Sequence, residues 1–260
     1  MEFFVICFVA LLVSALTLFS GFGLGTLLMP VFALFFPIPV AIAATAVVHL
    51  ANNLFKAALV GRKADWGVVL RFALPGAIAA VIGAALLNLF AHTPPLHSYV
   101  FGNQVREITT IKLAIGILII IFALMELIPY FNKLSFDRKY LPLGGLVSGF
   151  FGGLSGNQGA LRSAFLIKTG LEKEAFIGTG TVSSVIVDVA RLLVYGLSFY
   201  TASFGEIGEI GGLVLAACLA AFLGAYIGAR LVKKVTLRTL QVMVGGMLIL
   251  VGSGMITGLI

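Results

Sequence analysis

The chain has 260 residues, of which 60% are hydrophobic and only 10% are charged, and its mean hydropathy is +1.14. A water-soluble fold of this size would lack the polar side chains needed to cover its surface. The formal net charge of +7 comes from Lys and Arg residues that are scattered in ones and twos through short loops. That pattern is typical of membrane topology. We therefore expect a protein surrounded by the lipid bilayer, with no nucleic-acid partner.

Eight apolar runs follow one another, and each is about long enough to cross ~30 Å of hydrocarbon as a helix. They cover residues 3–36, 39–61, 67–90, 109–129, 141–168, 174–200, 206–231 and 237–260. Glu2 stands where a signal peptide carries basic residues, so we expect the first run to be retained. The longest gap, residues 91–107, contains prolines and histidines and is interpreted as a loop. No soluble domain fits between the runs.

The first and fifth runs are both interrupted by glycines. "SGFGLGTLLMPVF" begins at residue 20, and "SGFFGGLSGNQGALRSAF" begins at residue 148. Polar positions downstream agree in order, namely Thr45 with Thr179, Asn53 with Asp188, and Lys56 with Arg191. These matches predict a duplication, with residues 1–130 as the first repeat and residues 131–260 as the second repeat of one membrane domain.

The Lys and Arg residues outside the helix interiors indicate how the second broken run crosses the bilayer. If every run spans the bilayer, six of these Lys and Arg residues lie on one side and eight on the other, which is no bias. If the run at 141–168 turns back at its glycines, twelve lie on one side and only Arg106 and Lys112 on the other, as the positive-inside rule expects. We therefore predict an all-α polytopic membrane protein built as an inverted repeat. Each half has a glycine-broken or re-entrant first segment plus three transmembrane helices, and both termini lie outside.

A chain reversal at membrane depth leaves backbone groups unpaired, which is tolerated only against protein or a polar cavity. The half-helix that restarts after each reversal presents free N–H groups and the positive end of its dipole, and both attract anions. Close helix packing is the alternative reason for so many glycines. The predicted substrate-binding residues are Gly23, Gly25, Thr26, Asn52, Asn53, Gly156, Asn157, Gln158, Gly159 and Arg162.

Ionisable side chains inside a membrane are costly and are functional by default. His49 lies near the middle of its run, where it could carry a proton near neutral pH or serve as a hydrogen-bonded structural histidine. Asp188 and Arg191 are spaced i and i+3 and could neutralise each other. We name His49, Asp188 and Arg191 as candidate coupling residues, with protons as the coupling ion. Lys56 and Arg191 each lie five residues before a glycine, so they could instead extend to the membrane surface.

No metal or cofactor is expected. Cys7 and Cys218 lie in apolar segments with no CxxC motif and no neighbouring histidine. His92 and His97 are separated by two prolines, at a spacing that does not place two ligands on one helical face.

The segment "GLSG" at 153–156 matches the GxSG motif of rhomboid intramembrane proteases, which raises the alternative of a serine protease using Ser155. In that family the activating histidine follows the serine, whereas all three histidines of this chain precede it. We therefore expect no enzyme activity.

The paired glycine breaks also support a family assignment. The first is followed by "LLMP" and "AIAATAVVHLANNLFKA", and the second, "GFFGGLSGNQGALRSAF", is followed by "FIGTGTVSSVIVDVARLLVYG". Together they resemble the sulfite exporter TauE/SafE family over nearly the whole chain. The resemblance implies a multi-pass permease of the cytoplasmic (inner) membrane that moves sulfite, sulfonates or related sulfur-containing or organic anions. We expect a secondary transporter that works by alternating access, with a passive anion channel of the same fold as the alternative.

Overall fold

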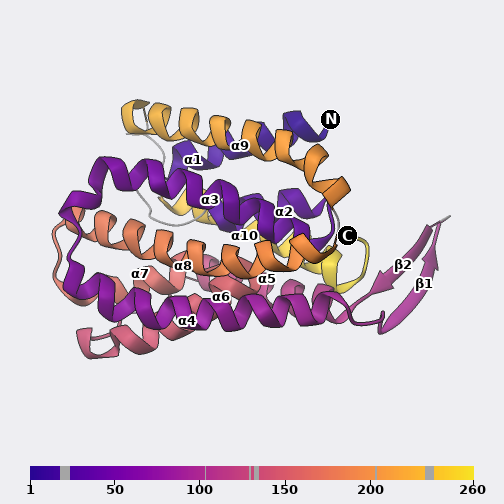
Figure 1. The fold of residues 1–260 in the computed structure, drawn as a ribbon, viewed down its shortest axis with the longest axis horizontal. Coiled ribbons are helices and arrows are strands. Elements are labelled where there is room, and N and C mark those ends of the chain that lie inside the picture. The colour runs from indigo at the N-terminus through magenta and orange to yellow at the C-terminus, as the bar shows by residue number, and fades with distance from the viewer. Residues whose placement is uncertain (18–23, 103, 129, 132–134, 203, 232–236) are drawn as a thin grey trace.

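The computed structural model describes all residues except 18–23, 103, 129, 132–134, 203 and 232–236. The described residues form α-helices that lie side by side along the long axis of the molecule, and one β-hairpin (Figure 1). The helices of the first half are α1 Glu2–Thr17, α2 Leu24–Ala33, α3 Ile38–Val60, α4 Trp66–Ala91 and α5 Thr110–Leu127. Those of the second half are α6 Leu141–Ser155, α7 Gly159–Leu166, α8 Lys173–Ala202, α9 Phe204–Leu231 and α10 Leu237–Ile256. The predicted all-α class is confirmed.

Four of the described helical segments are long and apolar enough to cross a membrane, namely Ile38–Lys63, Trp66–Ala91, Lys173–Leu197 and Ile210–Gly228. Shorter apolar segments lie in α1, α2, α5 and α10. Large apolar side chains are exposed along one stripe of α4, at Leu70, Leu74, Ile78 and Ile82. An exposed stripe of this kind fits contact with lipid. The chain is therefore a multi-pass membrane protein.

The run at 141–168 turns back inside the molecule, as the charge count predicts. α6 ends at Ser155, and Gly156 adopts a left-handed conformation with φ +81° that a residue with a side chain rarely takes. α7 then begins at Gly159 and returns toward the start of α6. On its return the Ala164 carbonyl accepts from the Phe136 N–H at 3.2 Å, and Lys168 Nζ lies 3.7 Å from Asp137 Oδ1, just before α6.

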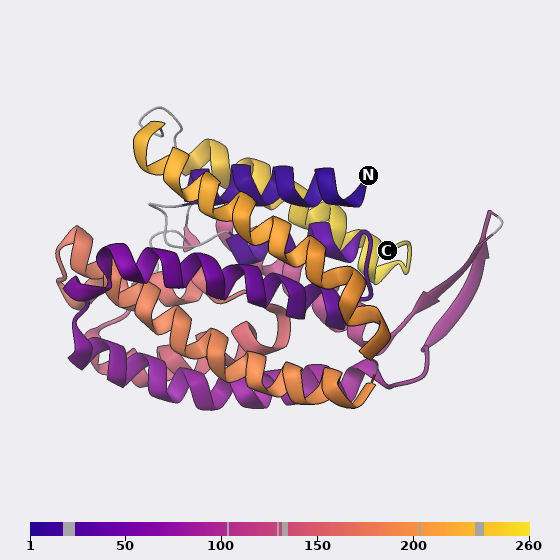
Figure 2. The same cartoon turned by 45° about the horizontal axis from the view of Figure 1, so that its top comes forward.

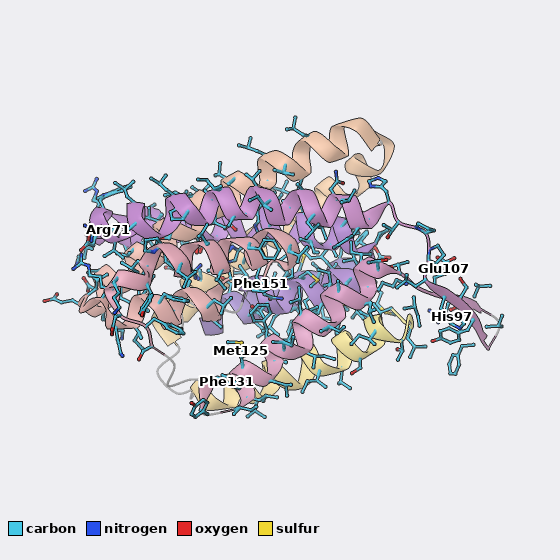
Figure 3. All side chains as sticks on the ribbon, turned by 90° about the horizontal axis from the view of Figure 1, so that it is seen from below. Arg71, His97, Glu107, Met125, Phe131 and Phe151 are labelled. Atoms are coloured by element: carbon cyan, nitrogen blue, oxygen red, sulfur yellow. The ribbon has the colours of Figure 1, made fainter. Side chains whose placement is uncertain are left out.

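Charged residues gather at one end of the bundle. Lys63 pairs with Glu174 there, and Figure 3 shows Arg71 at this end and His97 at the opposite end. The N- and C-termini lie at the same end as His97 and the hairpin (Figure 1). We call the end with Lys63 and Arg71 the Lys/Arg-rich end.

Glycines let several helix pairs approach until their backbones touch. On α6, Gly145, Gly149 and Gly153 face the α4 backbone so closely that an added Cβ would overlap a carbonyl oxygen. On α9, Gly224 and Gly228 meet the backbone of α1 in the same way. In membranes such contacts replace the hydrophobic drive that packs soluble helices. The α4–α6 pair becomes the α9–α1 pair when the two halves are exchanged, which fits the inverted repeat; the repeat itself stays a prediction.

The two broken segments meet at the centre of the molecule. A Cβ added to Gly25 in α2 would lie 3.2 Å from the Gly156 carbonyl oxygen and 3.5 Å from the His49 ring. α7 is held in place by a small apolar cluster, in which Phe165 and Leu166 pack with residues of α4 and α6. The start of α2 and the reversal at Gly156 thus lie beside the middle of α3.

The segment interpreted as a loop at 91–107 contains a hairpin instead. Strand β1, His97–Phe101, pairs antiparallel with β2, Gln104–Ile108, and Gly102 with φ +63° begins the turn. The hairpin projects beyond the helices (Figure 2), and the Tyr99 hydroxyl donates to the Thr257 carbonyl at 2.5 Å. Valine on both strands, Tyr99 and Phe101 on β1 and Ile108 on β2 favour this pairing. The prolines before β1 obscured that signal.

Candidate anion site

Five side chains of the Lys, Arg, His or Asp type are buried within the described bundle. They are His49 and Lys56 on α3, Arg162 on α7, and Asp188 and Arg191 on α8, and none is more than 8% exposed. The α3 and α8 residues belong to the two helices that pack against each other at the centre (Figure 1). Such burial is expensive unless the groups serve one another or a ligand.

Asp188 is the centre of a hydrogen-bonded network. Its Oδ1 accepts from Arg191 Nη2 at 2.7 Å and from Gln158 Nε2 at 3.1 Å. Its Oδ2 lies 2.7 Å from His49 Nδ1 and accepts from Asn53 Nδ2 at 3.3 Å. One carboxylate therefore joins α3, α8 and the reversal between α6 and α7. We call these five residues the central network.

Arg191 also holds the end of α6. Its Nη1 donates to the Gly152 carbonyl at 2.9 Å, and the Tyr195 hydroxyl donates to the Gly153 carbonyl. These carbonyls lie in the last turn of α6, which carries the negative end of the helix dipole, and the Gly152 carbonyl also accepts from the Gly156 N–H at 3.1 Å. Arg191 is fully buried, so its side chain does not extend to the membrane surface.

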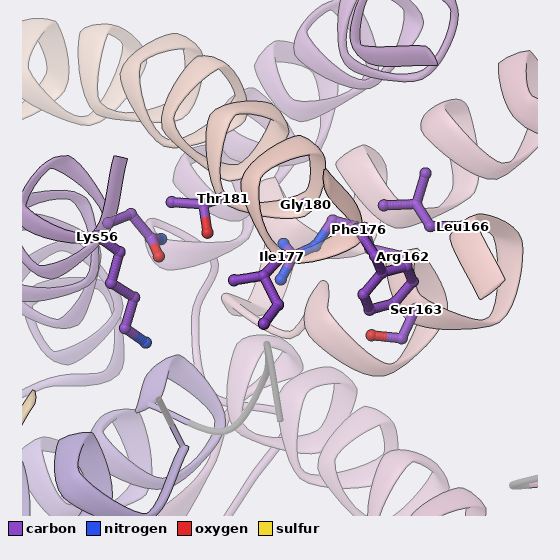
Figure 4. A pocket seen from close by; sticks show the side chains of 9 residues that line it. Lys56, Arg162, Ser163, Leu166, Phe176, Ile177, Gly180 and Thr181 are labelled. Carbon is purple, nitrogen blue, oxygen red and sulfur yellow. The ribbon is translucent and has the colours of Figure 1, made fainter. Parts of the chain in front are cut away.

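A small, partly open pocket lies between α3, α7 and α8 (Figure 4). Lys56 enters it from α3 and Arg162 from α7, on different sides. No acidic side chain is among the described residues that line it, which are Asn53, Lys56, Arg162, Ser163, Leu166, Phe176, Ile177, Gly180 and Thr181. Buried positive groups with hydroxyl and amide donors around them are the chemistry of an anion site.

The pocket lies on the Lys/Arg-rich side of the central network. Its α8 residues, Phe176 to Thr181, come early in the helix that starts at that end, and Asp188 follows deeper in the bundle. Asn53 belongs to both the pocket and the network, so the network forms the inner limit of the pocket. Arg162 donates from Nη1 to the hydroxyl of Ser184, one helical turn before Asp188.

The structure brings most of the predicted site residues together at the centre. Asn53 and Arg162 line the pocket, and Gln158 bonds to Asp188. Gly156 and Gly159 form the reversal, and Gly25 packs beside it.

Of the ten predicted residues only Asn53 and Arg162 are in the described pocket lining, and four of the others are either not described or outside the lining, the central network and the contacts just given. Asn52 accepts a hydrogen bond of 3.1 Å from Ser14 on α1, and Thr26 is buried within α2. Asn157 is 4% exposed, and neither polar atom of its side chain has a hydrogen-bond partner among the described residues. Gly23 falls outside the described residues.

Sequence reasoning left Lys56 open and did not single out Thr181, Ser163 or Tyr195. Lys56 lines the pocket, with only 8% of its surface exposed. Its spacing of three from Asn53 is the signal that places both on one helical face. Tyr195 follows Arg191 by four residues, so the two lie on one face of α8. Their partners, the Gly153 and Gly152 carbonyls, are known only once α6 packs against α8.

Ser155 does not have the environment of a nucleophile. Its hydroxyl donates to the Phe151 carbonyl at 3.0 Å, while the only buried histidine within the described residues, His49, is engaged with Asp188. A serine protease needs the two in direct contact. Within the residues that the structure describes, no group of three His, Cys, Asp or Glu side chains is placed to hold a metal ion.

Comparison with known proteins gave one family. The family model described as sulfite exporter TauE/SafE matches residues 6–255. The match includes both glycine breaks, the central network and the whole lining of the pocket. Neither the curated proteins nor the solved structures gave a match.

Proposed function

Because the chain belongs to the sulfite exporter TauE/SafE family, a family of membrane transporters and not of enzymes, we propose that it is a secondary transporter working by alternating access. Its substrate is a small sulfur-containing or organic anion, which it moves across the cytoplasmic membrane. The observation that carries the proposal is the partly open pocket lined by Lys56 and Arg162, with no acidic residue among its described lining. An anion seated there can accept from the Lys56 ammonium and from the Arg162 guanidinium, which also donates to Ser184.

The position of the pocket supports a carrier over a passive channel. It lies between the central network and the Lys/Arg-rich end, which the positive-inside rule makes cytoplasmic. Its inner limit is a network whose members bond directly to one another, through Asn53, His49, Asp188 and Gln158. A site closed on its inner side by packed side chains fits one of the two states that alternating access needs, whereas a channel needs a continuous path.

We infer that the two halves are inverted repeats and that the second state exchanges their roles. The exchange of the α4–α6 pair with the α9–α1 pair supports this, as does the approach of Gly25 in α2 to Gly156 and His49. The free N–H groups at the start of α2 and α7 are then candidate contacts for the anion on its way, together with the buried side chain of Asn157.

Protons are the proposed coupling ion, and His49 with Asp188 is the proposed site. The two side chains are in contact at 2.7 Å, and Asp188 also accepts from Gln158 at the start of α7. A proton arriving at this pair changes the hydrogen bonds that hold α7, the helix that carries Arg162.

The test is uptake of sulfite into proteoliposomes that contain the purified protein. A carrier gives saturable uptake that is inhibited by competing anions such as thiosulfate or taurine, and Arg162→Gln reduces it at least tenfold. Arg71→Gln, which changes an exposed arginine at the same end, is the matched control and leaves uptake unchanged. Uptake that rises linearly with concentration, without competition, would show a channel and refute the carrier.

A further inference from the structure

We propose that Arg191 is the cation of a second anion site, which forms toward the outer end of the bundle when Arg191 leaves α6, and that Lys56 then holds the end of α1 instead. The outer end is the end opposite the Lys/Arg-rich end. This inference rests on the proposed function, because it describes the opposite state of the same transporter, and its ligand is the same small anion. It starts from the match between Lys56 and Arg191 in the two halves of the chain.

Lys56 and Arg191 occupy matching positions on the two central helices. Lys56 lies three residues after Asn53 on α3, and Arg191 lies three residues after Asp188 on α8. A hydrogen bond of 3.3 Å from Asn53 to Asp188 joins the two helices between these positions. Because α3 ends at the Lys/Arg-rich end and α8 begins there, Lys56 lies toward that end from the bond, and Arg191 lies toward the outer end.

Arg191 holds the end of α6 in the described state. Its Nε and Nη2 donate to Asp188 Oδ1, and its Nη1 donates at 2.9 Å to the Gly152 carbonyl, in the last turn of α6. The side chain is fully buried, so all three guanidinium nitrogens are engaged inside the protein. An anion can therefore take Arg191 as its partner only in a state in which the bond to Gly152 is released.

Lys56 is positioned beside the end of α1. The Ser14 hydroxyl, near that end, donates to Asn52 Oδ1 on α3 at 3.1 Å. Both helices start at the outer end and run toward the Lys/Arg-rich end (Figure 1), so the residues of α1 up to Thr17 lie beside the turn of α3 that follows Asn52. Lys56 comes four residues after Asn52, on the same face of α3. The carbonyls at the end of α1 carry the negative end of its dipole and attract an ammonium group, as those of α6 attract Arg191.

The two halves hold their short helices in different packings. Every residue of α2 is buried, whereas the buried residues of α7 are only Gly159, Arg162, Phe165 and Leu166. α2 packs closely against α3, while α7 contacts α8 more loosely and leaves the pocket beside it. Within the described residues α6 packs against α8 more closely than α1 packs against α3. Matching elements in two packings are what two interconvertible states of a repeat require.

The opposite state places Arg191 as Lys56 is placed now. α2 then loosens from α3, and an outer pocket forms between α8, α2 and α3 with Arg191 in its wall. Ala46 is the counterpart of Gly180, which lines the described pocket, because both follow the matched threonines by one residue. Ala46 is fully buried in the described state. Its exposure to the outer solution is therefore a measure of the opposite state.

The experiment asks whether Ala46 becomes accessible from the outer face and whether this depends on Lys56. Ala46→Cys is combined with Cys7→Ser and Cys218→Ala, which replace both native cysteines. Right-side-out membrane vesicles, in a buffer without sulfur oxyanions, are treated with a membrane-impermeant maleimide. We expect Ala46→Cys to be labelled, and Lys56→Met to slow the labelling by about fivefold or more, because the opposite state loses its hold on α1. A lysine that only contacts the anion would have no effect when no anion is present.

Two matched variants and an added anion complete this experiment. Lys56→Arg supplies the residue of the other half and should be labelled within about twofold of the parent, as should Lys168→Met, which alters an exposed lysine. External sulfate or methanesulfonate, neither of which reacts with the maleimide, should slow the labelling by about threefold or more by occupying the site at Arg191.

A second measurement needs no added cysteine. Hydrogen exchange at the backbone amides of Leu24–Ala33 reports how often α2 separates from α3. Lys56→Met should slow this exchange by about fivefold or more, because the opposite state becomes rarer, whereas Lys168→Met should leave it unchanged.

Each outcome has a defined meaning. If Ala46→Cys is never labelled from outside in a protein that still takes up sulfite, or if neither sulfate nor methanesulfonate slows its labelling, the outer site is refuted while the carrier stands. Unchanged labelling or unchanged hydrogen exchange in Lys56→Met refutes the role of Lys56 in the opposite state. If the unaltered protein shows no saturable sulfite uptake, the proposed function fails and this inference fails with it.

Discussion

Replacing Arg191 with methionine should destabilise the protein far more than a change in a residue that only contacts substrate. The guanidinium donates two hydrogen bonds to Asp188 Oδ1, at 3.0 and 2.7 Å, and one of 2.9 Å to the Gly152 carbonyl. Removing one partner of a buried ion pair costs about 3–5 kcal/mol, because the other charge stays buried. The Gly152 carbonyl keeps its bond of 3.1 Å from the Gly156 N–H, so the loss of the Arg191 donor there adds little to that cost.

This loss can be measured as a melting temperature in detergent. One kcal/mol corresponds to about 2–4 °C for chains somewhat shorter than this one, so Arg191→Met should melt about 6–20 °C lower. The control, Arg71→Met, alters an exposed side chain and should shift the melting temperature by less than about 2 °C. The double variant Asp188→Asn with Arg191→Met removes both charges and should recover at least half of the loss.

The reasoning fails if Arg191→Met melts within about 2 °C of Arg71→Met, or if the double variant recovers nothing. The first result would mean that the bonds to Asp188 and Gly152 do not stabilise the fold. Arg191 would then act only in coupling, in which case its replacement changes sulfite uptake without changing the melting temperature. The two roles are thus separated by one pair of measurements.

Three further predictions follow from the same contacts. His49→Gln should abolish the response of sulfite uptake to an imposed proton gradient while anion binding changes by less than threefold; an unchanged response would remove His49 from the coupling step. Gly149→Val should prevent the protein from folding, because a Cβ there overlaps the Gly76 backbone. Gly196→Val has open space around it, so this variant should be recovered from detergent in normal amounts. Equal recovery of the two variants would contradict the tight α4–α6 contact. Arg162→Gln should weaken sulfite binding by about tenfold or more and reduce its dependence on salt, whereas Lys168→Gln, exposed near the same end, should change neither; identical binding in both variants would move the anion away from the pocket.

Much of the fold could be predicted because lipid constrains sequence so strongly. The ends of the apolar runs agree with the helix ends to within a few residues, and the reversal at Gly156 followed from the side on which Lys168 has to lie. The hairpin was missed because two five-residue strands next to prolines give only a weak sequence signal for β-structure. Its two strands also pair only with each other in the described structure.

The site was predicted less evenly, for reasons that helix geometry explains. Asn53 and Asn52 are adjacent in sequence, but one residue turns a helix by about 100°, so only Asn53 reaches Asp188 while Asn52 faces α1. Lys56 could not be placed from its distance to the helix end, since a lysine stem reaches either water or the interior. The capping of α6 by Arg191 depends on which helices become neighbours, and no local pattern encodes that.

The difference in attachment between α6 and α7 has a mechanical consequence. Three glycines of α6 pack against the α4 backbone along its length, and its last turn accepts hydrogen bonds from Arg191 and Tyr195. Displacing α6 would break all of these interactions at once. α7 is only two turns long and follows the left-handed Gly156. It is attached through Phe165 and Leu166 and through the bonds from Gln158 to Asp188 and from Arg162 to Ser184. Under the proposed transport cycle, α7 is therefore the element expected to move when the anion binds, while the α4–α6 pair stays in place.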